Sequence, residues 1–146
     1  MAGASRKRGR YYGGRDGKGF CPWPVECATH PNFYGLSAIA KALLFELLGQ
    51  YRGRNNGDLT TAWSVLKHRG WRSRDTVQRA EGELLRTGWI VKTRQGGRNR
   101  CNLFALTFFD IDECGGKLDT HRVGERLSYW RLGYNPELSE QEGQAA

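Results

Sequence analysis

Arginine, glutamine and small polar side chains gather in two segments of the sequence. The first segment contains Arg72, Ser73, Arg74, Thr76, Gln78 and Arg79. The second segment contains Arg94, Gln95, Arg98, Asn99 and Arg100. Arginine and glutamine can make paired hydrogen bonds to guanine and adenine edges, whereas hydroxyl groups and the first amides of a helix suit phosphate. These residue types predict contacts with a nucleic-acid duplex.

The residue types of common catalytic sites occur without the spacing that such sites require. His30, His68 and His121 have no serine or cysteine nearby in a recognisable motif. No glycine-rich phosphate loop follows a predicted strand. We therefore expect neither an enzyme nor a cofactor.

The four cysteines are the remaining candidates for chemistry. No two of them are spaced as Cys-x-x-Cys and nothing indicates an oxidising compartment, so we interpret them as reduced thiols. A zinc site could draw its ligands from Cys21, Cys27 and His30, with Cys114 or His121 as the fourth. That spacing is irregular for zinc, and we expect no bound metal.

The charge distribution favours a polyanionic partner. The 146 residues carry 23 basic and 15 acidic side chains, a formal charge of +8, and the pI is near 9.6. Up to Arg100 there are 19 basic and 7 acidic residues, and after it 4 basic and 8 acidic residues, which gives +12 and −4. A basic body with an acidic tail suits a protein that lays one face on a polyanion.

The length predicts one folded domain with tails, because 146 residues can bury one compact core but not two. No run approaches the roughly 18 apolar residues of a membrane span, and the basic N-terminus lacks the apolar core of a signal peptide. We therefore expect a soluble, cytoplasmic protein with no membrane partner.

The first 20 residues are rich in glycine and in basic side chains, including Arg6, Lys7, Arg8 and Arg10. Such a segment cannot bury enough apolar surface to offset the entropy of ordering it, so we expect a disordered arm. The arm could follow the phosphates or the minor groove of a duplex, with its tyrosine pair as a stacking surface. A solubilising tail is an equally good interpretation.

The first helical pattern runs over residues 36–48, where leucine, isoleucine and alanine recur on one broad side. Ser37 is placed to cap the start of this helix and Gly49 to stop it. Phe45 points away from the apolar side. We expect it to pack against residues 21–34 rather than to form a dimer contact.

Two further patterns predict helices over 58–68 and from Ser73 to about Thr87, joined by a break that contains glycine. Two short helices joined by such a turn form a helix-turn-helix. The later helix buries one apolar face, and the opposite face at 100° per residue is basic and polar. That opposite face contains Arg72, Thr76, Arg79, Glu83 and Arg86.

After Gly88 the periodicity changes from 3.6 to 2, which predicts two strands over 89–93 and 101–108. Gly96 and Gly97 in the connection permit a hairpin turn. Three arginines crowd the tip, and the neighbouring sequence contains no carboxylate to balance them. We therefore expect an uncompensated cationic tip.

The order of helix, helix, turn, capped helix and basic hairpin over 36–108 resembles the winged helix-turn-helix DNA-binding domains of bacterial transcription regulators. Four stretches are similar to a version found in small phage, plasmid and integrated-element proteins. They are Gly-Arg-Asn-Asn-Gly-Asp-Leu (53–59), Arg-Gly-Trp-Arg-Ser-Arg-Asp-Thr (69–76), Glu-Leu-Leu-Arg-Thr-Gly-Trp-Ile (83–90) and Thr-Arg-Gln-Gly-Gly-Arg-Asn-Arg (93–100). The resemblance implies an α+β fold, with a three-helix core and a β-hairpin wing.

By this resemblance the winged helix-turn-helix domain covers residues 21–109, between the basic arm (1–20) and a C-terminal extension (110–146). The third helix is expected in the major groove and the wing along the adjacent backbone or minor groove. Carried over by position, the polar residues listed above for the two segments become the groove and wing contacts.

Two acidic residues limit this assignment, because Asp75 and Glu83 lie among the candidate contacts and would repel phosphate. The helix arginines could instead form a solvated face with helical ion pairs, such as Arg79 with Glu83. Arg86 lies near the end of the helix, where the helix dipole explains a cation.

The C-terminal extension is less patterned. Its acidic run at 110–119 lacks the spacing of an EF-hand and predicts a polar loop. Val123, Leu127 and Trp130 are spaced for a short amphipathic helix, which we expect to pack onto the core rather than to form a partner surface. Residues 137–146 are expected to be disordered.

These observations favour a sequence-specific double-stranded DNA-binding protein, most simply a transcription regulator of a bacterial mobile element that acts as a homodimer. A plasmid or phage replication or partition protein would use the same domain to mark DNA. A winged-helix adaptor in a larger protein or ribonucleoprotein complex is a third alternative, because a fold alone does not set a function.

Overall fold

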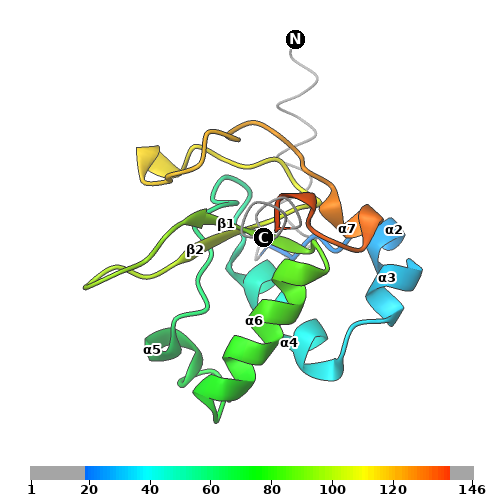
Figure 1. The fold of residues 1–146 in the computed structure, drawn as a ribbon, viewed down its shortest axis with the longest axis horizontal. Coiled ribbons are helices and arrows are strands. Elements are labelled where there is room, and N and C mark those ends of the chain that lie inside the picture. The colour runs from blue at the N-terminus through cyan, green and yellow to red at the C-terminus, as the bar shows by residue number, and fades with distance from the viewer. Residues whose placement is uncertain (1–18, 139–146) are drawn as a thin grey trace, which may run out of the picture.

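The computed structural model describes residues 19–138 (Figure 1). In this part the chain has an α+β fold of short and medium helices with one two-stranded antiparallel hairpin. The basic residues expected in the N-terminal arm, Arg6, Lys7, Arg8 and Arg10, lie outside the described residues, as do residues 139–146. No helix within 19–138 combines the length and apolar character needed to cross a bilayer.

The elements follow the order of the chain. They are α2 (Val25–Ala28), α3 (Pro31–Tyr34), α4 (Ala38–Gln50), α5 (Trp63–Leu66), α6 (Arg74–Arg86), β1 (Ile90–Arg94), β2 (Leu103–Leu106), the 3-10 turn η1 (Cys114–Gly116) and α7 (Tyr129–Leu132). The two longest helices, α4 and α6, pack against each other, and the hairpin projects from the body beside them (Figure 1).

Both long helices begin where their capping serines predict. The Ser37 Oγ accepts a hydrogen bond from the Ala40 amide (3.2 Å), and the Ser73 Oγ accepts one from the Thr76 amide (3.3 Å). Each cap satisfies an amide that has no partner inside the helix. The predicted stop at Gly49 is wrong, because α4 continues to Gln50.

The helix predicted over 58–68 is much shorter in the structure. Only Trp63–Leu66 is helical, whereas residues 58–62 are not helical and residues 67–68 form a turn. Leu59 forms an antiparallel bridge with Phe104, its amide donating to the Phe104 carbonyl (3.2 Å) and its carbonyl accepting the Phe104 amide (2.9 Å). Leu59 is fully buried in this conformation. Its apolar side chain is therefore removed from water as well as it would be in a helix, while its backbone groups pair with Phe104.

The hairpin forms, but its turn lies two residues later than predicted. Strands β1 and β2 pair with Val91 opposite Ala105. Two hydrogen bonds between Gly97 and Arg100 (2.9 and 3.2 Å) close a turn with Arg98 and Asn99 at its tip. Asn99 adopts φ = 60°, which asparagine tolerates better than most residues.

Gly96 is needed in the hairpin because a side chain would not fit there, and not because of its backbone dihedral angles. A Cβ at this position would lie 2.7 Å from both the Arg100 carbonyl oxygen and the Asn102 amide nitrogen. A side chain there would force the two arms of the hairpin apart.

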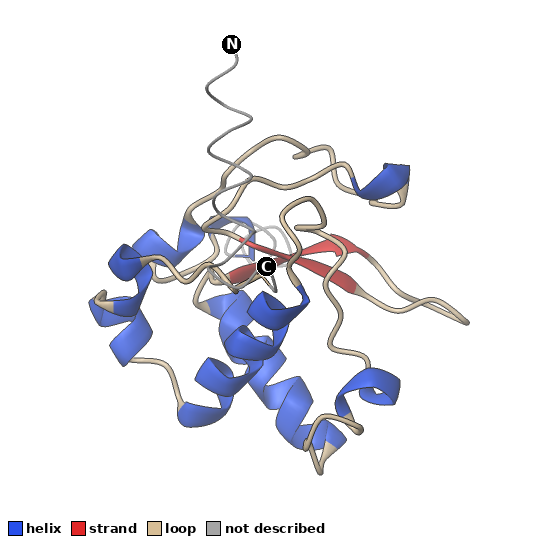
Figure 2. Cartoon of the chain, turned by 180° about the vertical axis from the view of Figure 1, so that it is seen from behind, coloured by secondary structure: helices blue, strands red, loops and turns tan. Residues whose placement is uncertain are grey.

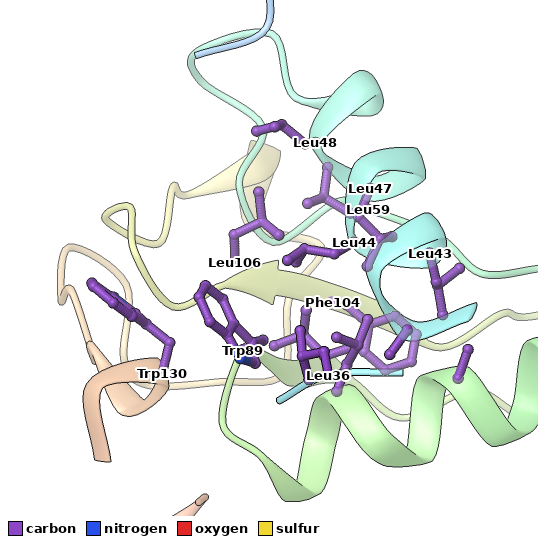
Figure 3. Packing of buried hydrophobic residues seen from close by; sticks show 14 of the residues in the cluster. Leu36, Leu43, Leu44, Leu47, Leu48, Leu59, Trp89, Phe104, Leu106 and Trp130 are labelled. Atoms are coloured by element: carbon purple, nitrogen blue, oxygen red, sulfur yellow. The ribbon is translucent and has the colours of Figure 1, made fainter. Parts of the chain in front are cut away.

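The core lies between α4, α6 and the hairpin (Figure 3). Its largest fully buried side chains are Trp89, Trp130, Phe104, Leu43, Leu44, Leu47, Leu48, Leu59, Leu66, Leu84, Ile90 and Leu106. Phe45 remains half exposed, with its ring centroid 5.4 Å from that of Trp23. The prediction that Phe45 packs against residues 21–34 is confirmed.

The C-terminal extension packs onto the body, as expected, but the short amphipathic helix predicted through Val123, Leu127 and Trp130 is wrong, because only Tyr129–Leu132 is helical and Val123 is 44% exposed. The Trp130 ring stacks on Trp89 at 5.3 Å between centroids, and both side chains are buried (Figure 3). Glu137 accepts a hydrogen bond from the Tyr129 hydroxyl (3.0 Å) and pairs with Arg122 (2.6 Å). Glu137 therefore has a defined place in the fold, which corrects the expectation of disorder from that residue onward.

Asn56 joins the hairpin to the extension. It is 0% exposed, and its side-chain amide donates to the carbonyls of Leu106 (3.0 Å), Phe109 (3.3 Å) and Asp110 (3.0 Å). Its Oδ1 accepts the Leu106 amide (2.8 Å), and its own backbone exchanges hydrogen bonds with Asp112 (2.9 and 2.8 Å). One buried side chain thus holds the end of β2 and the start of the extension together.

Replacing Asn56 with alanine should lower the free energy of unfolding by at least about 3 kcal/mol, because it leaves several buried amide and carbonyl groups without partners. Asn55→Ala is the matched control. Asn55 makes two hydrogen bonds in the same loop, but it is only half buried and water can replace them, so about 1 kcal/mol should be lost. Urea unfolding measures both values, and equal losses would contradict the role given to Asn56.

Candidate nucleic-acid interface

Helix α6 presents one buried face and one exposed ridge. Val77, Ala80 and Leu84 are buried in the core. The opposite side carries the exposed side chains of Arg74, Asp75, Gln78, Arg79 and Arg86. Side chains three and four residues apart share a face of a helix, so this ridge is a continuous polar surface.

The predicted contact residues at the start of α6 differ in how much of each side chain is exposed to solvent. Arg72 and Arg74 are exposed, and neither makes an ion pair or a side-chain hydrogen bond within residues 19–138. Ser73 and Thr76 are half buried, and the Ser73 hydroxyl already accepts the Thr76 amide. The two arginines are therefore available to a ligand, whereas the serine oxygen serves the helix.

The ion pair suggested between Arg79 and Glu83 does not form. Glu83 turns toward the start of α4, where its Oε2 accepts the Ser37 amide at 2.8 Å. Arg79 pairs instead with Asp75, four residues earlier, with 3.0 Å between Nε and Oδ2. Glu83 therefore leaves the ridge, which corrects its placement on the exposed basic face.

The hairpin tip is less cationic than its sequence suggests. Arg98 and Asn99 are exposed at the turn, but Arg100 pairs with Asp119 of the extension (2.8 Å). Asp119 is held beside the hairpin because its amide donates to the Thr93 carbonyl (2.9 Å). The expectation of an uncompensated tip is therefore wrong for Arg100, because the balancing carboxylate comes from 19 residues further along the chain.

The remaining residues of the second segment mostly bond within the hairpin. The Arg94 guanidinium donates to the Cys101 carbonyl (3.0 Å). The backbone amide of Gln95 donates to the Asp119 carboxylate (3.1 Å), and the side-chain Oε1 of Gln95 accepts from the Lys92 Nζ (3.2 Å). Arg98 therefore remains as the exposed arginine of this segment with no acidic partner among the described residues.

The start of α6 and the hairpin tip are both at the periphery of the molecule. In Figure 1 the hairpin tip is at the far left and the start of α6 at the bottom, with α5 between them in the view, and Figure 2 shows the same arrangement from behind. The segment that leads into α6 carries Arg72 and Arg74, and the hairpin tip carries Arg98.

The cations of the extension are neutralised by the protein itself. Their ion pairs are Lys117 with Asp58 (2.9 Å), Arg122 with Glu137 (2.6 Å), Arg126 with Asp110 (2.9 Å) and Arg131 with Glu26 (2.7 Å). The exposed arginines at α6 and at the hairpin tip differ from them in having no such partner, apart from Arg79 and Arg100. Uncompensated positive charge is therefore found before the extension and not on it: besides Arg72, Arg74 and Arg98, the exposed basic residues without an acidic partner among residues 19–138 are Arg52, Arg54, Lys67, Arg86 and Lys92.

Two of the residues weighed as zinc ligands have structural roles. The His30 Nδ1 accepts the Asn32 amide (3.0 Å) and caps α3, and Cys27 is buried in the core. Within residues 19–138 no three histidine, cysteine or acidic side chains are grouped as metal ligands.

Comparisons of the chain with protein-family models, with curated protein sequences and with solved structures found no match. The residues and their arrangement are therefore the basis for a functional proposal.

Sequence reasoning missed two ion pairs, that of Asp75 with Arg79 and that of Asp119 with Arg100, although it had named Asp75 among the candidate contacts. Asp75 lies four residues before Arg79, a spacing that predicts a helical ion pair. Asp119 gives no local signal, because its approach to Arg100 depends on the path of the extension.

The reactivity of the four cysteine thiols tests which of them the fold buries. Burial raises the pKa of Cys27 to about 12 and that of Cys114 to about 11, so both should be almost entirely protonated at pH 8. Cys21 and Cys101 are exposed. A thiol-reactive disulfide reagent at pH 8 should therefore label Cys21 and Cys101 quickly and the other two slowly, until denaturant exposes all four. Rapid labelling of Cys27 in the native protein would contradict its place in the core.

Proposed function

We propose that this protein binds double-stranded DNA with sequence specificity, with α6 in the major groove and the hairpin tip on adjacent phosphates. The order α4, α5, α6 and hairpin is that expected of a winged helix-turn-helix domain, and it supports this arrangement. The observation that carries the proposal is the exposed positive charge without an acidic partner at Arg72 and Arg74, at the start of α6, and at Arg98, at the hairpin tip, in a molecule whose extension neutralises its own cations.

The dimensions of the elements are suited to a duplex. With 13 residues, α6 is about 20 Å long, and a major groove about 12 Å wide admits a helix of ordinary diameter. A duplex carries a negative charge about every 1.7 Å along its axis. Binding by unpaired guanidinium groups on the approaching surface is therefore favoured by the release of counterions.

The exposed side chains then fall into two roles. Gln78 and Arg79, in the middle of the ridge, are placed to contact base edges. Arg72 and Arg74 at the start of α6 and Arg98 at the hairpin tip are placed to bind phosphate. Arg100 contributes less, because Asp119 already neutralises it.

Selection of bound duplexes from a random pool at two salt concentrations tests the proposal. Enrichment of a common sequence, with affinity well above that for random duplex, is the expected result. Binding that ignores sequence, or no binding, would contradict it. A footprint in front of a gene would assign the protein to transcription regulation, which we propose as its role, whereas an array of sites at an origin would assign it to replication or partition.

Replacing Arg98 with alanine should weaken binding to all duplexes alike and flatten the dependence of log K on log salt by about 1, because one phosphate contact is lost. Arg126→Ala is the matched control, since Arg126 is equally an exposed arginine but pairs with Asp110 on the extension. It should leave the slope unchanged, and Arg100→Ala should change it less than Arg98→Ala. A slope unaffected by Arg98→Ala would remove the hairpin tip from the interface.

A further inference from the structure

We infer that Asp75 is a positioning residue that aims Arg79 at a guanine, so that the preferred target carries a G·C pair opposite the middle of α6. The inference rests on the proposed DNA binding and names the base that this part of the site recognises. It concerns an acidic residue on a surface that is otherwise suited to phosphate.

The geometry of the ion pair leaves the useful end of Arg79 free. The Asp75 Oδ2 contacts Nε of Arg79 at 3.0 Å, and no other hydrogen bond or ion pair engages the Arg79 side chain within residues 19–138. A guanidinium group carries five N–H donors in a planar fork, one on Nε and four on the two terminal nitrogens. Because the aspartate takes the Nε side, both terminal nitrogens remain available for guanine O6 and N7.

The other acidic neighbour does not compete for Arg79. Glu83 is four residues after Arg79 and could pair with it on a regular helix. Its carboxylate is instead occupied by the Ser37 amide (2.8 Å). Arg79 is therefore held from one side, toward the start of α6, which restricts its direction.

The surface around Arg79 leaves room for a base edge. One groove is lined by Asp75, Gln78, Arg79, Gly82, Glu83 and Arg86 of α6 together with Ser37 and Ile39, and the Glu83 carboxylate in it is the one that accepts the Ser37 amide. Gly82 has no side chain, and a Cβ there would meet only the Arg86 Nη1 (3.2 Å). A glycine within a helix lowers its stability, so its place on the ridge one turn after Arg79 is consistent with a close approach by a ligand.

The stability of the fold does not account for the Asp75–Arg79 pair. The side chains are 77% and 64% exposed, and ion pairs at such exposure contribute little to folding. A long exposed arginine otherwise samples many rotamers, and immobilising it on DNA is unfavourable. An aspartate that restricts the arginine before binding reduces the conformational entropy lost on binding. This favours guanine, the base whose two acceptors match the planar guanidinium donors.

The test compares base preference in variants on the duplex obtained by selection, with each base pair substituted in turn. Arg79→Ala should lose a G·C preference at one position, worth between about fivefold and 150-fold in affinity. Asp75→Ala should lose part of the preference at that same position, while its affinity for random duplex stays equal or rises because a negative charge is removed. Asp75→Ala should have no further effect on preference in the Arg79→Ala background.

Asp110→Ala is the matched control, because it breaks an exposed aspartate–arginine pair of similar length (2.9 Å) on the extension and should leave every base preference unchanged. Thermal unfolding checks that Asp75→Ala folds, as expected from the intact Ser73 cap of α6. If Asp75→Ala tightens binding to all duplexes and keeps the preference, this inference is overturned and the proposed function stands. If the unaltered protein enriches no duplex sequence, the proposed function fails and the inference with it.

Discussion

The buried amide of Asn56 is the interaction on which the arrangement of this protein depends. It binds both the amide and the carbonyl of Leu106 at the end of β2, together with two carbonyls at the start of the extension. Leu106 is the last residue of β2, and the carbonyls of Phe109 and Asp110 lie beyond the end of the strand, outside its pairing with β1. A side chain with two donors and an acceptor can satisfy them inside the core, where an unpaired polar group is costly.

The direction that the extension takes from this point determines the charges on the outside. It runs beside β1, so that Asp119 meets Thr93 and pairs with Arg100, and it then returns to place Trp130 on Trp89. Its cations pair with carboxylates along this path. The extension therefore neutralises the surface that it covers and leaves the start of α6 and the hairpin tip positively charged.

The local elements were predictable where their signals were local. The Ser73 cap and the apolar face of α6 follow from residues within one or two turns of each other, and both are as predicted. The extended conformation of Leu59 was not predictable in this way, because its partner Phe104 is 45 residues away. The position of the hairpin turn was predicted wrongly for a different reason, because Asn99 adopts the positive φ that glycine was expected to supply.

The composition of the candidate site, namely which arginine and polar residues lie on one helix and one hairpin, follows from the amino-acid sequence. Helical and strand periodicities depend on neighbours a few residues apart, so a linear reading captures them. Which of those arginines lack an acidic partner depends on how the chain folds, because the carboxylate that compensates a guanidinium can come from a distant part of the sequence. Asp119 and Arg100 show this over 19 residues, and Glu83 shows it again by turning to Ser37 on another helix.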